Sequence, residues 1–405
     1  MTRFELPGLP NIHSHAFQRA MAGLAERQGD ARDSFWTWRE LMYRFAGRIT
    51  PESLHAIAAQ LYAEMLEAGY TCVCEFHYLH HQADGTRYED PAAMSQALIS
   101  AARETGIRMT LLPVLYMQGG FDGRALSARQ QRFGHGVDEF VSLVQALRVH
   151  EDANLRVGVA IHSLRAVAPD AMRDLLASPV ADGPVHIHIA EQVTEVEECI
   201  ASRGARPVQW LLDNAHVDAR WTLVHATHLE PVECDAIARS NAVVAICPTT
   251  EANLGDGLFD LRRFLDAGGR FGIGSDSNVS VSPVEELRWL EYGQRLALRQ
   301  RNIAARPGRP SVGESLVLGA VAGGRQSSGM AGQEADIVVL DPEATSLAGA
   351  AAADLHDRFV FAGNRNPVSE VHVGGKCVVS QGQHPARTAI SARYQHTLRA
   401  LLADS

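Results

Sequence analysis

The sequence predicts an α/β protein: a (β/α)8 barrel of the TIM type, with a small β-sandwich-like domain built largely from the C-terminal part. Eight short apolar segments alternate with segments of helical periodicity, and these segments are continuous apolar runs rather than alternating ones. Continuous apolar runs are typical of parallel strands that are covered by helices, and eight such strands close a barrel. After about residue 305 the chain becomes rich in short β-type runs, which predicts the second domain.

The predicted barrel strands follow one another along the first three quarters of the chain. They cover residues 10–15, 71–79, 108–116, 156–163, 185–191, 221–228, 242–248 and 271–276. The first connecting helix should begin with Thr50 as its N-cap and Pro51 at its first position, and end at Gly69. Pro231 and Pro283 open two later helices in the same way.

The C-terminal part follows a linker-like stretch, RPGRPS, at residues 306–311. Strands are expected at 335–342, 358–363 and 369–382, and the last of these should be a hairpin that turns at Gly374-Gly375. A closing helix is expected at 388–402. We therefore expect a barrel over residues 7–305 and a small β-domain from residues 1–6 and 306–405. Only about eight residues precede the first barrel strand, so this domain should draw mainly on the C-terminal part.

Composition restricts the class of protein. The 405 residues are 46% hydrophobic and carry a net charge of −10, from 37 basic and 47 acidic residues. This balance argues against a nucleic-acid partner, which normally requires a basic surface. An apolar run of about 18 residues and a signal peptide are both missing from the sequence, so we expect a cytoplasmic protein without a membrane partner. Six cysteines without a CxxC pair favour buried thiols in a reducing compartment.

Ionisable residues gather where the predicted strands end, which is the edge that carries function in such barrels. His13 and His15 are two residues apart on the first strand and can therefore point the same way. The fifth, sixth and eighth strands deliver His188, Glu191, His225 and Asp276. Three imidazoles and a carboxylate suit a zinc ion. A lone HxH pair is a weak signal, but so many ionisable groups would be costly to bury for packing alone.

Other polar residues have a structural interpretation. His186 lies deeper in the fifth strand than His188 and is expected to be a core residue held by hydrogen bonds. His77 and His228 are expected to be structural or to lie at the rim. Cys72 and Cys74 share the two-residue spacing, but the apolar strand around them favours packing.

The order HSH, HIAE, VHATH and SDS along these strands resembles the amidohydrolase superfamily. Within it the likeness to the formimidoylglutamate deiminases, or N-formimino-L-glutamate iminohydrolases, runs through most of residues 6–301. It is carried by LPGLPNIHSHAFQRAMAGLAE, DSFWTWRELMYRF, CEFHYLHH, GVAIHSLRAV, HIHIAEQ and GIGSDSNVSVSPVEELRWLEYGQRL. The resemblance implies hydrolysis of N-formimino-L-glutamate to N-formyl-L-glutamate and ammonia in histidine degradation. The alternative on the same scaffold is another aminohydrolase, such as a guanine, cytosine or adenosine deaminase.

The resemblance also implies a metal site. Two-metal sites in this superfamily are often bridged by a carbamylated lysine near the end of the fourth strand. The single lysine, Lys376, lies outside the predicted barrel, so we expect one divalent ion, zinc, per chain. The implied ligands are His13, His15, His188 and Asp276. Asp276 and His225 would orient a water and accept its proton, and Glu191 would pass a proton to the substrate nitrogen.

The implied substrate is a small dicarboxylate, for which arginine is the preferred partner. Arg39 and Arg165 resemble the carboxylate-binding residues of the family, and Trp36 and Trp38 suggest that Arg39 lies in a partly enclosed loop. Further contacts are expected from Gln18, Tyr78 and His162, whereas Arg19 is expected to be structural. Relatives also suggest a homodimer. A barrel that binds metal without turnover is a second alternative; it would lack Glu191, His225 or Asp276, and all three are present.

Overall fold

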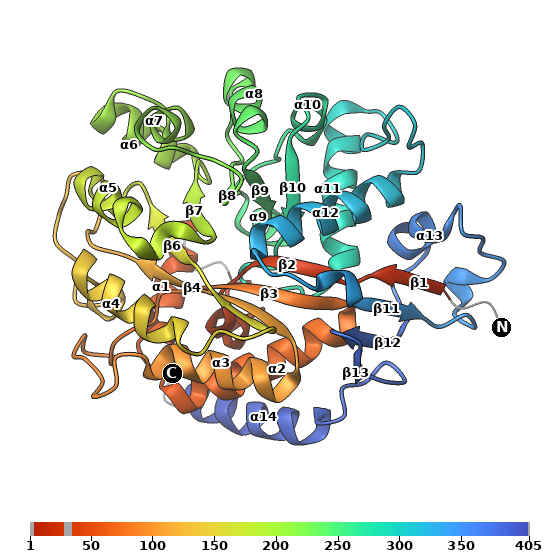
Figure 1. The fold of residues 1–405 in the computed structure, drawn as a ribbon, viewed down its shortest axis with the longest axis horizontal. Helices are drawn as coiled ribbons and strands as arrows, with labels where there is room; N and C mark the ends of the chain where they lie inside the picture. Colours follow the sequence, from red (N-terminus) through yellow and green to blue (C-terminus); the bar gives the residue numbers. More distant parts are fainter. Residues whose placement is uncertain (1–3, 28–34, 404–405) are drawn as a thin grey trace.

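The computed structural model describes residues 4–27 and 35–403, whose parallel strands form a closed barrel with helices between them (Figure 1). The barrel strands are β2 (Leu9–Ser14), β3 (Tyr70–His77), β4 (Arg108–Leu115), β6 (Val159–Ser163), β7 (Val185–Ile189), β8 (Trp221–His225), β9 (Val243–Ile246) and β10 (Arg270–Ile273). Each strand pairs in parallel with its neighbours, and pairing of β3 with β4 closes the ring. The predicted TIM-type barrel is confirmed.

The fourth barrel position is split into two strands at Gly158. The short β5 (Leu155–Val157) and β6 both pair with β4. A Cβ atom at Gly158 would lie 2.7 Å from the carbonyl oxygen of Pro184, so only glycine allows this approach. The sequence predicted a single strand over 156–163, whereas the structure has two strands separated by Gly158.

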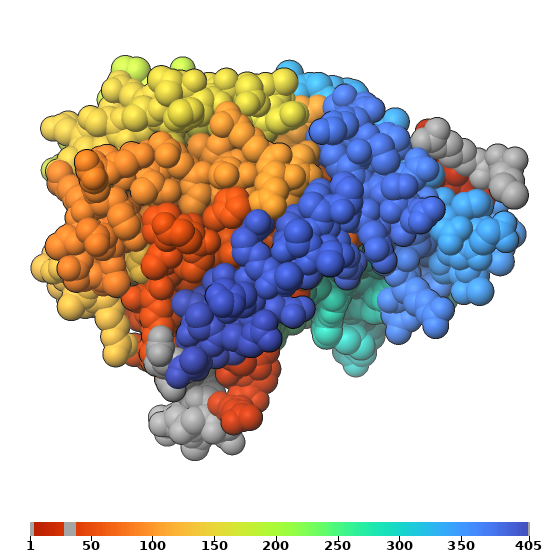
Figure 2. Space-filling model, turned by 90° about the horizontal axis from the view of Figure 1, so that it is seen from below, coloured from red at the N-terminus to blue at the C-terminus, as the bar shows by residue number. Residues whose placement is uncertain are grey.

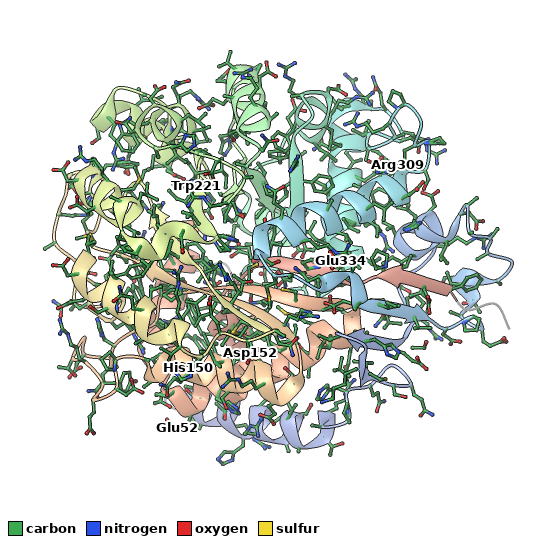
Figure 3. The ribbon with its side chains drawn as sticks, viewed as in Figure 1. Glu52, His150, Asp152, Trp221, Arg309 and Glu334 are labelled. Carbon is green, nitrogen blue, oxygen red and sulfur yellow. The ribbon has the colours of Figure 1, made fainter. Side chains whose placement is uncertain are left out.

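The barrel helices begin where the sequence signals them. In α2 (Pro51–Ala68) the Thr50 hydroxyl accepts a hydrogen bond from the backbone N–H of Ser53, and Glu52 lies in the first turn (Figure 3). Gly69 ends this helix with a φ of 103°, which favours glycine. The other helices around the barrel are η1 (Ala16–Met21), α1 (Phe35–Ala46), α3 (Ala93–Thr105), η2 (Gln131–Phe133), α4 (Val137–Arg148), α5 (Pro169–Ala177), η3 (Pro179–Asp182), α6 (Val193–Arg203), α7 (Pro207–Asn214), α8 (Pro231–Ser240), α9 (Pro248–Leu254), α10 (Leu261–Asp266) and α11 (Pro283–Leu298).

A second sheet is antiparallel and lies beside the barrel (Figure 1). Its order is β1 (Phe4–Pro7), β11 (Ile337–Leu340), β12 (Val368–Val373) and β13 (Lys376–Val379), so one strand comes from the N-terminal end and three from the C-terminal part. This antiparallel sheet is the second, small β-structure that the sequence predicted, built largely from the C-terminal part. The predicted hairpin is present, and Gly374 and Gly375 turn it with φ of 57° and 80°.

The segment 358–363, which we expected to be a strand, is helical over residues 358–361. It belongs to α13 (Leu355–Phe361), whose buried residues Leu355, Phe359 and Val360 are spaced for one helix face. An Arg358–Asp354 ion pair of 2.8 Å, four residues apart, supports the helix. The strand prediction was wrong because the apolar run is too short to distinguish the two-residue period of a strand from the 3.6-residue period of a helix.

The remaining C-terminal helices pack on the barrel and on its helices. α12 (Val312–Ser328) lies against β10 and β2, and α14 (Arg387–Ala403) lies against α2. Figure 2 shows α14, in dark blue, across the orange and red surface of the N-terminal segments. The short η4 (Gln333–Ala335) and η5 (Thr345–Leu347) complete the elements. In the described ranges no helix has both the length and the apolarity for crossing a membrane.

Candidate metal centre and substrate cavity

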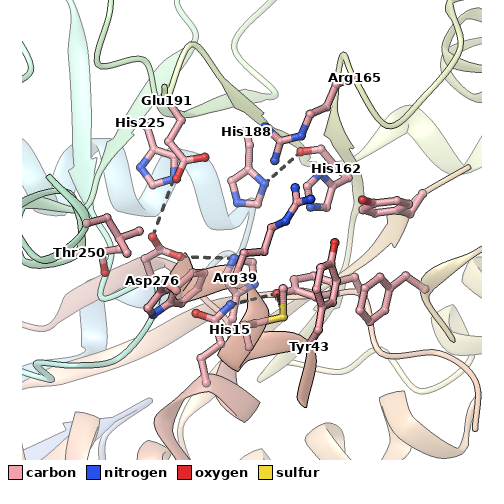
Figure 4. Close-up of a pocket in the computed structure, with 17 residues that line it drawn as sticks. His15, Arg39, Tyr43, His162, Arg165, His188, Glu191, His225, Thr250 and Asp276 are labelled. Carbon is pink, nitrogen blue, oxygen red and sulfur yellow. Dashed lines mark hydrogen bonds and ion pairs between the residues drawn. The ribbon is translucent and has the colours of Figure 1, made fainter. Parts of the chain in front are cut away.

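Side chains from three separate parts of the sequence lie close together at the carboxyl ends of the barrel strands: His13 and His15, His188, and Asp276. Figure 4 shows His15, His188 and Asp276. His13 Nε2 lies 3.0 Å from His188 Nε2 and 3.4 Å from Asp276 Oδ1. His15 Nε2 lies 3.3 Å from the same Asp276 oxygen. Two groups of three that contain His13 have ligand atoms close enough to share an ion: His13 with His15 and Asp276, and His13 with His188 and His225.

Hydrogen bonds to backbone carbonyls fix which ring nitrogens can bind a metal. His15 Nδ1 lies 2.8 Å from the oxygen of Phe76, and His188 Nδ1 lies 3.0 Å from the oxygen of His162. A carbonyl can only accept, so both Nδ1 atoms carry hydrogen and donate. The Nε2 atoms of the neutral rings are then free of hydrogen, which is the tautomer that binds a cation.

The protonation states also fit a metal. Burial lowers the pKa of His13 to about 3, and it lowers the pKa of His15 and His188 as well. These imidazoles are therefore neutral at physiological pH. Burial would raise the pKa of Asp276, but a hydrogen bond with His13 and the neighbouring imidazoles hold it below its usual range. Three neutral imidazoles and one carboxylate suit a divalent cation.

His225 and Glu191 lie beside this cluster. His225 Nε2 is 3.7 Å from Glu191 Oε1 and 3.8 Å from Asp276 Oδ2, while its Nδ1 is 3.3 Å from Glu251 Oε1. Burial alone would lower the pKa of His225, but Glu191, Glu251 and Asp276 together raise it to about 10. Burial raises the pKa of Glu191 against the opposing effects of His225 and Arg165, so this carboxyl group can hold a proton more readily than an exposed one.

The same cavity extends from the metal cluster to two guanidinium groups (Figure 4). Its lining includes Arg39 and Arg165 and all three further predicted contacts, Gln18, Tyr78 and His162. Gln18 Nε2 donates to Tyr78 Oη at 2.9 Å, which fixes both side chains at the wall. The cavity is therefore polar at one end and cationic at the other, as a small anionic substrate requires.

Arg39 reaches the cavity from a helix. It lies on α1 and not in the expected loop, and its guanidinium is 5.4 Å from the ring centroid of Tyr43. The side chain of Trp36, which suggested the loop, lies outside the described residues, whereas Trp38 lines the cavity. Residues four positions apart lie on the same face of a helix. Tyr43 therefore reaches the cavity from the same face of α1 as Arg39.

The sequence did not identify several residues of the cavity wall. Tyr116 directly follows the third barrel strand, and Thr250 lies in the helix after the seventh, so their positions after strand ends were available signals. Tyr43 could have been found from its spacing to Arg39. Phe133 lies in a connecting segment, and nothing in the local sequence places it at the wall.

Residues that we interpreted as structural do have structural surroundings. His186 is fully buried, and its Nε2 lies 3.2 Å from the oxygen of Ser327, away from the cavity. Arg19 forms an ion pair with Glu64 at 2.9 Å and donates to the oxygen of Asn278. Cys72 and Cys74 are buried in β3.

Comparison with known proteins agrees with this geometry. Residues 4–378 match the family model of the amidohydrolase family. The chain belongs to the amidohydrolase family. A formimidoylglutamate deiminase from Pseudomonas aeruginosa is 52% identical over 98% of this chain and 89% of its own length. A 5-methylthioadenosine/S-adenosylhomocysteine deaminase from Natronomonas pharaonis is 26% identical over 92% of this chain and 81% of its own.

Solved structures of amidohydrolases show the same fold. The crystal structure of an amidohydrolase from Brucella melitensis has 47% sequence identity and a TM-score of 0.93, covering 98% of this chain and 90% of that one. A triazine hydrolase from Arthrobacter aurescens has 22% identity and a TM-score of 0.83, covering 98% and 88%, and it supports the fold alone. The family is metal-dependent, which agrees with the groups of potential metal-binding side chains around His13.

Proposed function

We propose that this amidohydrolase is a formimidoylglutamate deiminase, which hydrolyses N-formimino-L-glutamate to N-formyl-L-glutamate and ammonia in histidine degradation. One observation carries the proposal: a single cavity has the metal-ligand cluster at one end and the guanidinium groups of Arg39 and Arg165 at the other. Two cations suit a substrate with two carboxylates. The identity of 52% to the deiminase from Pseudomonas aeruginosa supports this choice of substrate.

The proposed cofactor is one zinc ion held by His13, His15, His188 and Asp276. The lysine that bridges two metals in some relatives has no counterpart, since Lys376 is the only lysine of the chain. Zinc suits imidazole nitrogen and carboxylate oxygen, and three or four such ligands leave a position for water. When bound, the ion supplies a water whose pKa is lowered to about 7.

Residues beside the cluster would then handle the protons. Glu251 fixes the His225 ring so that its Nε2 faces Asp276 and Glu191. His225, whose raised pKa keeps its ring protonated, would orient the water, and Asp276 would accept the proton of the water as its oxygen adds to the formimino carbon. Glu191 transfers a proton to the terminal nitrogen, the bond between that nitrogen and the carbon breaks, and ammonia leaves. The product keeps the new oxygen as the formyl carbonyl, so the atoms balance.

The remaining cavity residues would bind and orient the substrate. Arg39 and Arg165 hold its carboxylates, and Gln18, Tyr78 and His162 offer polar contacts along its length. A nucleobase, which is planar and uncharged, would leave both guanidinium groups without an anion inside a low-dielectric cavity, which costs free energy. This argument favours the dicarboxylate over guanine, cytosine or adenosine.

The test is a parallel ammonia-release assay with N-formimino-L-glutamate, adenosine, guanine and cytosine. We expect turnover of the first compound alone, loss of turnover after chelation, and recovery on adding zinc. Elemental analysis should find one ion per chain. Turnover of a nucleobase in preference to formiminoglutamate would overturn the substrate, and two ions per chain would overturn the single-metal site.

A further inference from the structure

The backbone just beyond the end of β7 has two amide groups that the sheet does not pair. The ladder between β7 and β8 ends at Ile189, which lies opposite His225. Ala190 then turns into the left-handed region with a φ of 50°, and the chain reaches Glu191. Ala190 and Glu191 are both buried, and a buried N–H without an acceptor costs free energy. These two N–H groups therefore need an acceptor from outside the sheet.

A single carboxylate is the acceptor for both groups. Glu195 Oε1 accepts from the N–H of Ala190 at 3.1 Å, and its Oε2 accepts from the N–H of Glu191 at 2.9 Å. We call this pair of hydrogen bonds the Glu195 clamp. The carbonyl oxygen of Ala190 accepts in turn from the N–H of His228 at 3.1 Å. The segment that carries Glu191 is thus held from two sides, by the chain after β8 and by the clamp.

A helix cap alone does not explain this arrangement. Glu195 is the third residue of α6, where an acidic side chain commonly turns back to the N–H of the N-cap residue. Glu233 does so at the same position of α8, accepting from the N–H of its N-cap residue Glu230 at 2.8 Å. Glu195 instead reaches past its N-cap residue, Gln192, to the two residues before it. Its carboxylate therefore holds the end of the strand rather than the start of the helix.

Glu195 also acts electrostatically on the substrate end of the cavity. Burial would lower the pKa of Arg165, but the charge of Glu195 and then that of Glu191 raise it. Figure 4 shows Arg165 and Glu191 at the same cavity, where they follow β6 and β7. Glu195 itself is 2% exposed, and the described lining of the cavity does not include it. It can therefore affect the reaction only through other residues.

We propose that Glu195 is a positioning residue for the deimination, whose clamp on the backbone of Ala190 and Glu191 aims the Glu191 carboxyl group at the leaving nitrogen. The inference rests on the proposed function, because Glu191 is the proton donor of that mechanism. Without the clamp, the turn at Ala190 relaxes and Glu191 loses its position. A misplacement of about 1 Å at a reacting group can lower a rate about a hundredfold.

Glu195→Gln tests the clamp in catalysis. The amide keeps the size of the side chain but has one acceptor oxygen in place of two, so one of the two N–H groups loses its partner. We expect kcat for N-formimino-L-glutamate to fall between about tenfold and about a hundredfold. KM should stay within about threefold, because Arg39 and Arg165 still hold the substrate. Steady-state ammonia release measures both constants, and elemental analysis should find the zinc content of the parent.

A double variant separates positioning from a general loss of structure. If Glu195 acts through Glu191, its replacement has little left to disturb once Glu191 no longer carries a proton. Glu191→Gln/Glu195→Gln should therefore keep kcat within about threefold of Glu191→Gln alone. A fall in kcat that multiplies the two single effects would overturn the proposal, because independent defects add in free energy.

Two control variants remove other carboxylates from the same kind of place. Glu198→Gln makes the same change of charge on the exposed side of α6, and Glu233→Gln removes the buried cap of α8. Both should keep the kcat of the parent, and circular dichroism checks that each variant is folded. A folded control that loses as much kcat as Glu195→Gln would overturn the proposal, since the effect would then not be specific to the clamp.

Hydrogen exchange tests the clamp without any substrate. Deuterium uptake of the metal-loaded protein, followed by mass spectrometry, should be at least about tenfold faster at the amides of Ala190 and Glu191 in Glu195→Gln than in the parent or in Glu198→Gln. Unchanged exchange at these amides, or unchanged kcat in Glu195→Gln, would overturn the inference. If the parent releases no ammonia from formiminoglutamate, the proposed function fails, and the exchange result alone decides the clamp.

Discussion

At the scale of single residues, the candidate catalytic groups lie on backbone that L-amino acids rarely adopt. Ala190, His225 and Asp276 have φ of 50°, 68° and 46°, and each lies at or just after the end of a barrel strand. Such conformations cost of order 1–3 kcal/mol each and persist where the surrounding structure imposes them. Their position beside the metal cluster indicates that the fold tolerates this cost to aim Glu191, His225 and Asp276 into one cavity.

Glu191→Gln tests the proton transfer. The amide keeps the size of the side chain but cannot deliver a proton, so kcat should fall at least about a hundredfold. Zinc content should stay at one per chain, because Glu191 is not among the proposed ligands. Steady-state kinetics and elemental analysis measure both quantities. Glu197→Gln, at an exposed position of α6, is the control and should keep full activity; normal turnover by Glu191→Gln would contradict the assigned role.

Arg165→Ala tests carboxylate binding. Loss of one charge-assisted contact of about 2 kcal/mol should raise KM for formiminoglutamate roughly 30-fold, with zinc retained. Arg165→Lys should recover part of the affinity, since lysine keeps the charge without the planar, bidentate geometry. Arg173→Ala, at an exposed site on α5, serves as the control. The carboxylate role is wrong if KM of Arg165→Ala equals that of the parent enzyme.

At the scale of elements, α12 seals the bottom of the barrel by a close approach to β10 and β2. A Cβ atom at Gly323 would lie 2.0 Å from the oxygen of Phe271, and one at Gly324 would lie 2.7 Å from Cγ of Pro10. The first neighbour is backbone and cannot move aside alone. Glycine at these positions therefore sets the distance between the helix and the strand that leads to Asp276.

Gly323→Ala should destabilise the protein by about 2 kcal/mol or more, because the helix must shift away from β10. The free energy of unfolding from urea titration measures the effect. Ala322→Gly, at the exposed neighbouring position, should cost only about 1 kcal/mol from helix propensity. If Gly323→Ala were as stable as the parent, the close approach would not limit packing at this point.

The sequence predicted the elements whose signal is local. Continuous apolar runs located the barrel strands, and the Gly374-Gly375 pair located the hairpin, because these patterns depend on neighbouring residues only. The helix α13 was missed because its buried positions emerge only when Leu355 is read together with Phe359.

The part of the candidate site that lies at the ends of barrel strands could be predicted from the sequence. His13, His15, His188 and Asp276 could be grouped because parallel strands bring their carboxyl ends to one edge. Tyr43 and Phe133 reach the same cavity from a helix and from a connecting segment, whose docking depends on contacts far along the chain. Their positions therefore needed the structure.

At the scale of the whole molecule, buried neutral histidines outside the metal cluster couple stability to pH. His77, His80 and His135 lie together, with ring centroids 5.2 Å apart for His77 and His80 and 4.5 Å apart for His80 and His135. Burial lowers the pKa of His77 to about 3 and that of His135 to about 4, and it holds the pKa of His80 well below its usual value. These rings are neutral when the chain is folded and regain a pKa of about 6.5 when it unfolds.

The unfolded chain therefore binds more protons than the folded chain below about pH 6.5, and stability should fall as pH decreases from there towards 4. Each such histidine can contribute up to about 1.4 kcal/mol per pH unit in this window.

His135→Phe, which keeps an aromatic ring of similar shape, should lose less stability between pH 7.5 and pH 5 than the parent enzyme. Urea unfolding at the two pH values measures the difference. His396→Gln, at an exposed position of α14, should change with pH as the parent does. An equal loss of stability in His135→Phe and the parent would show that this buried group does not set the acid limit.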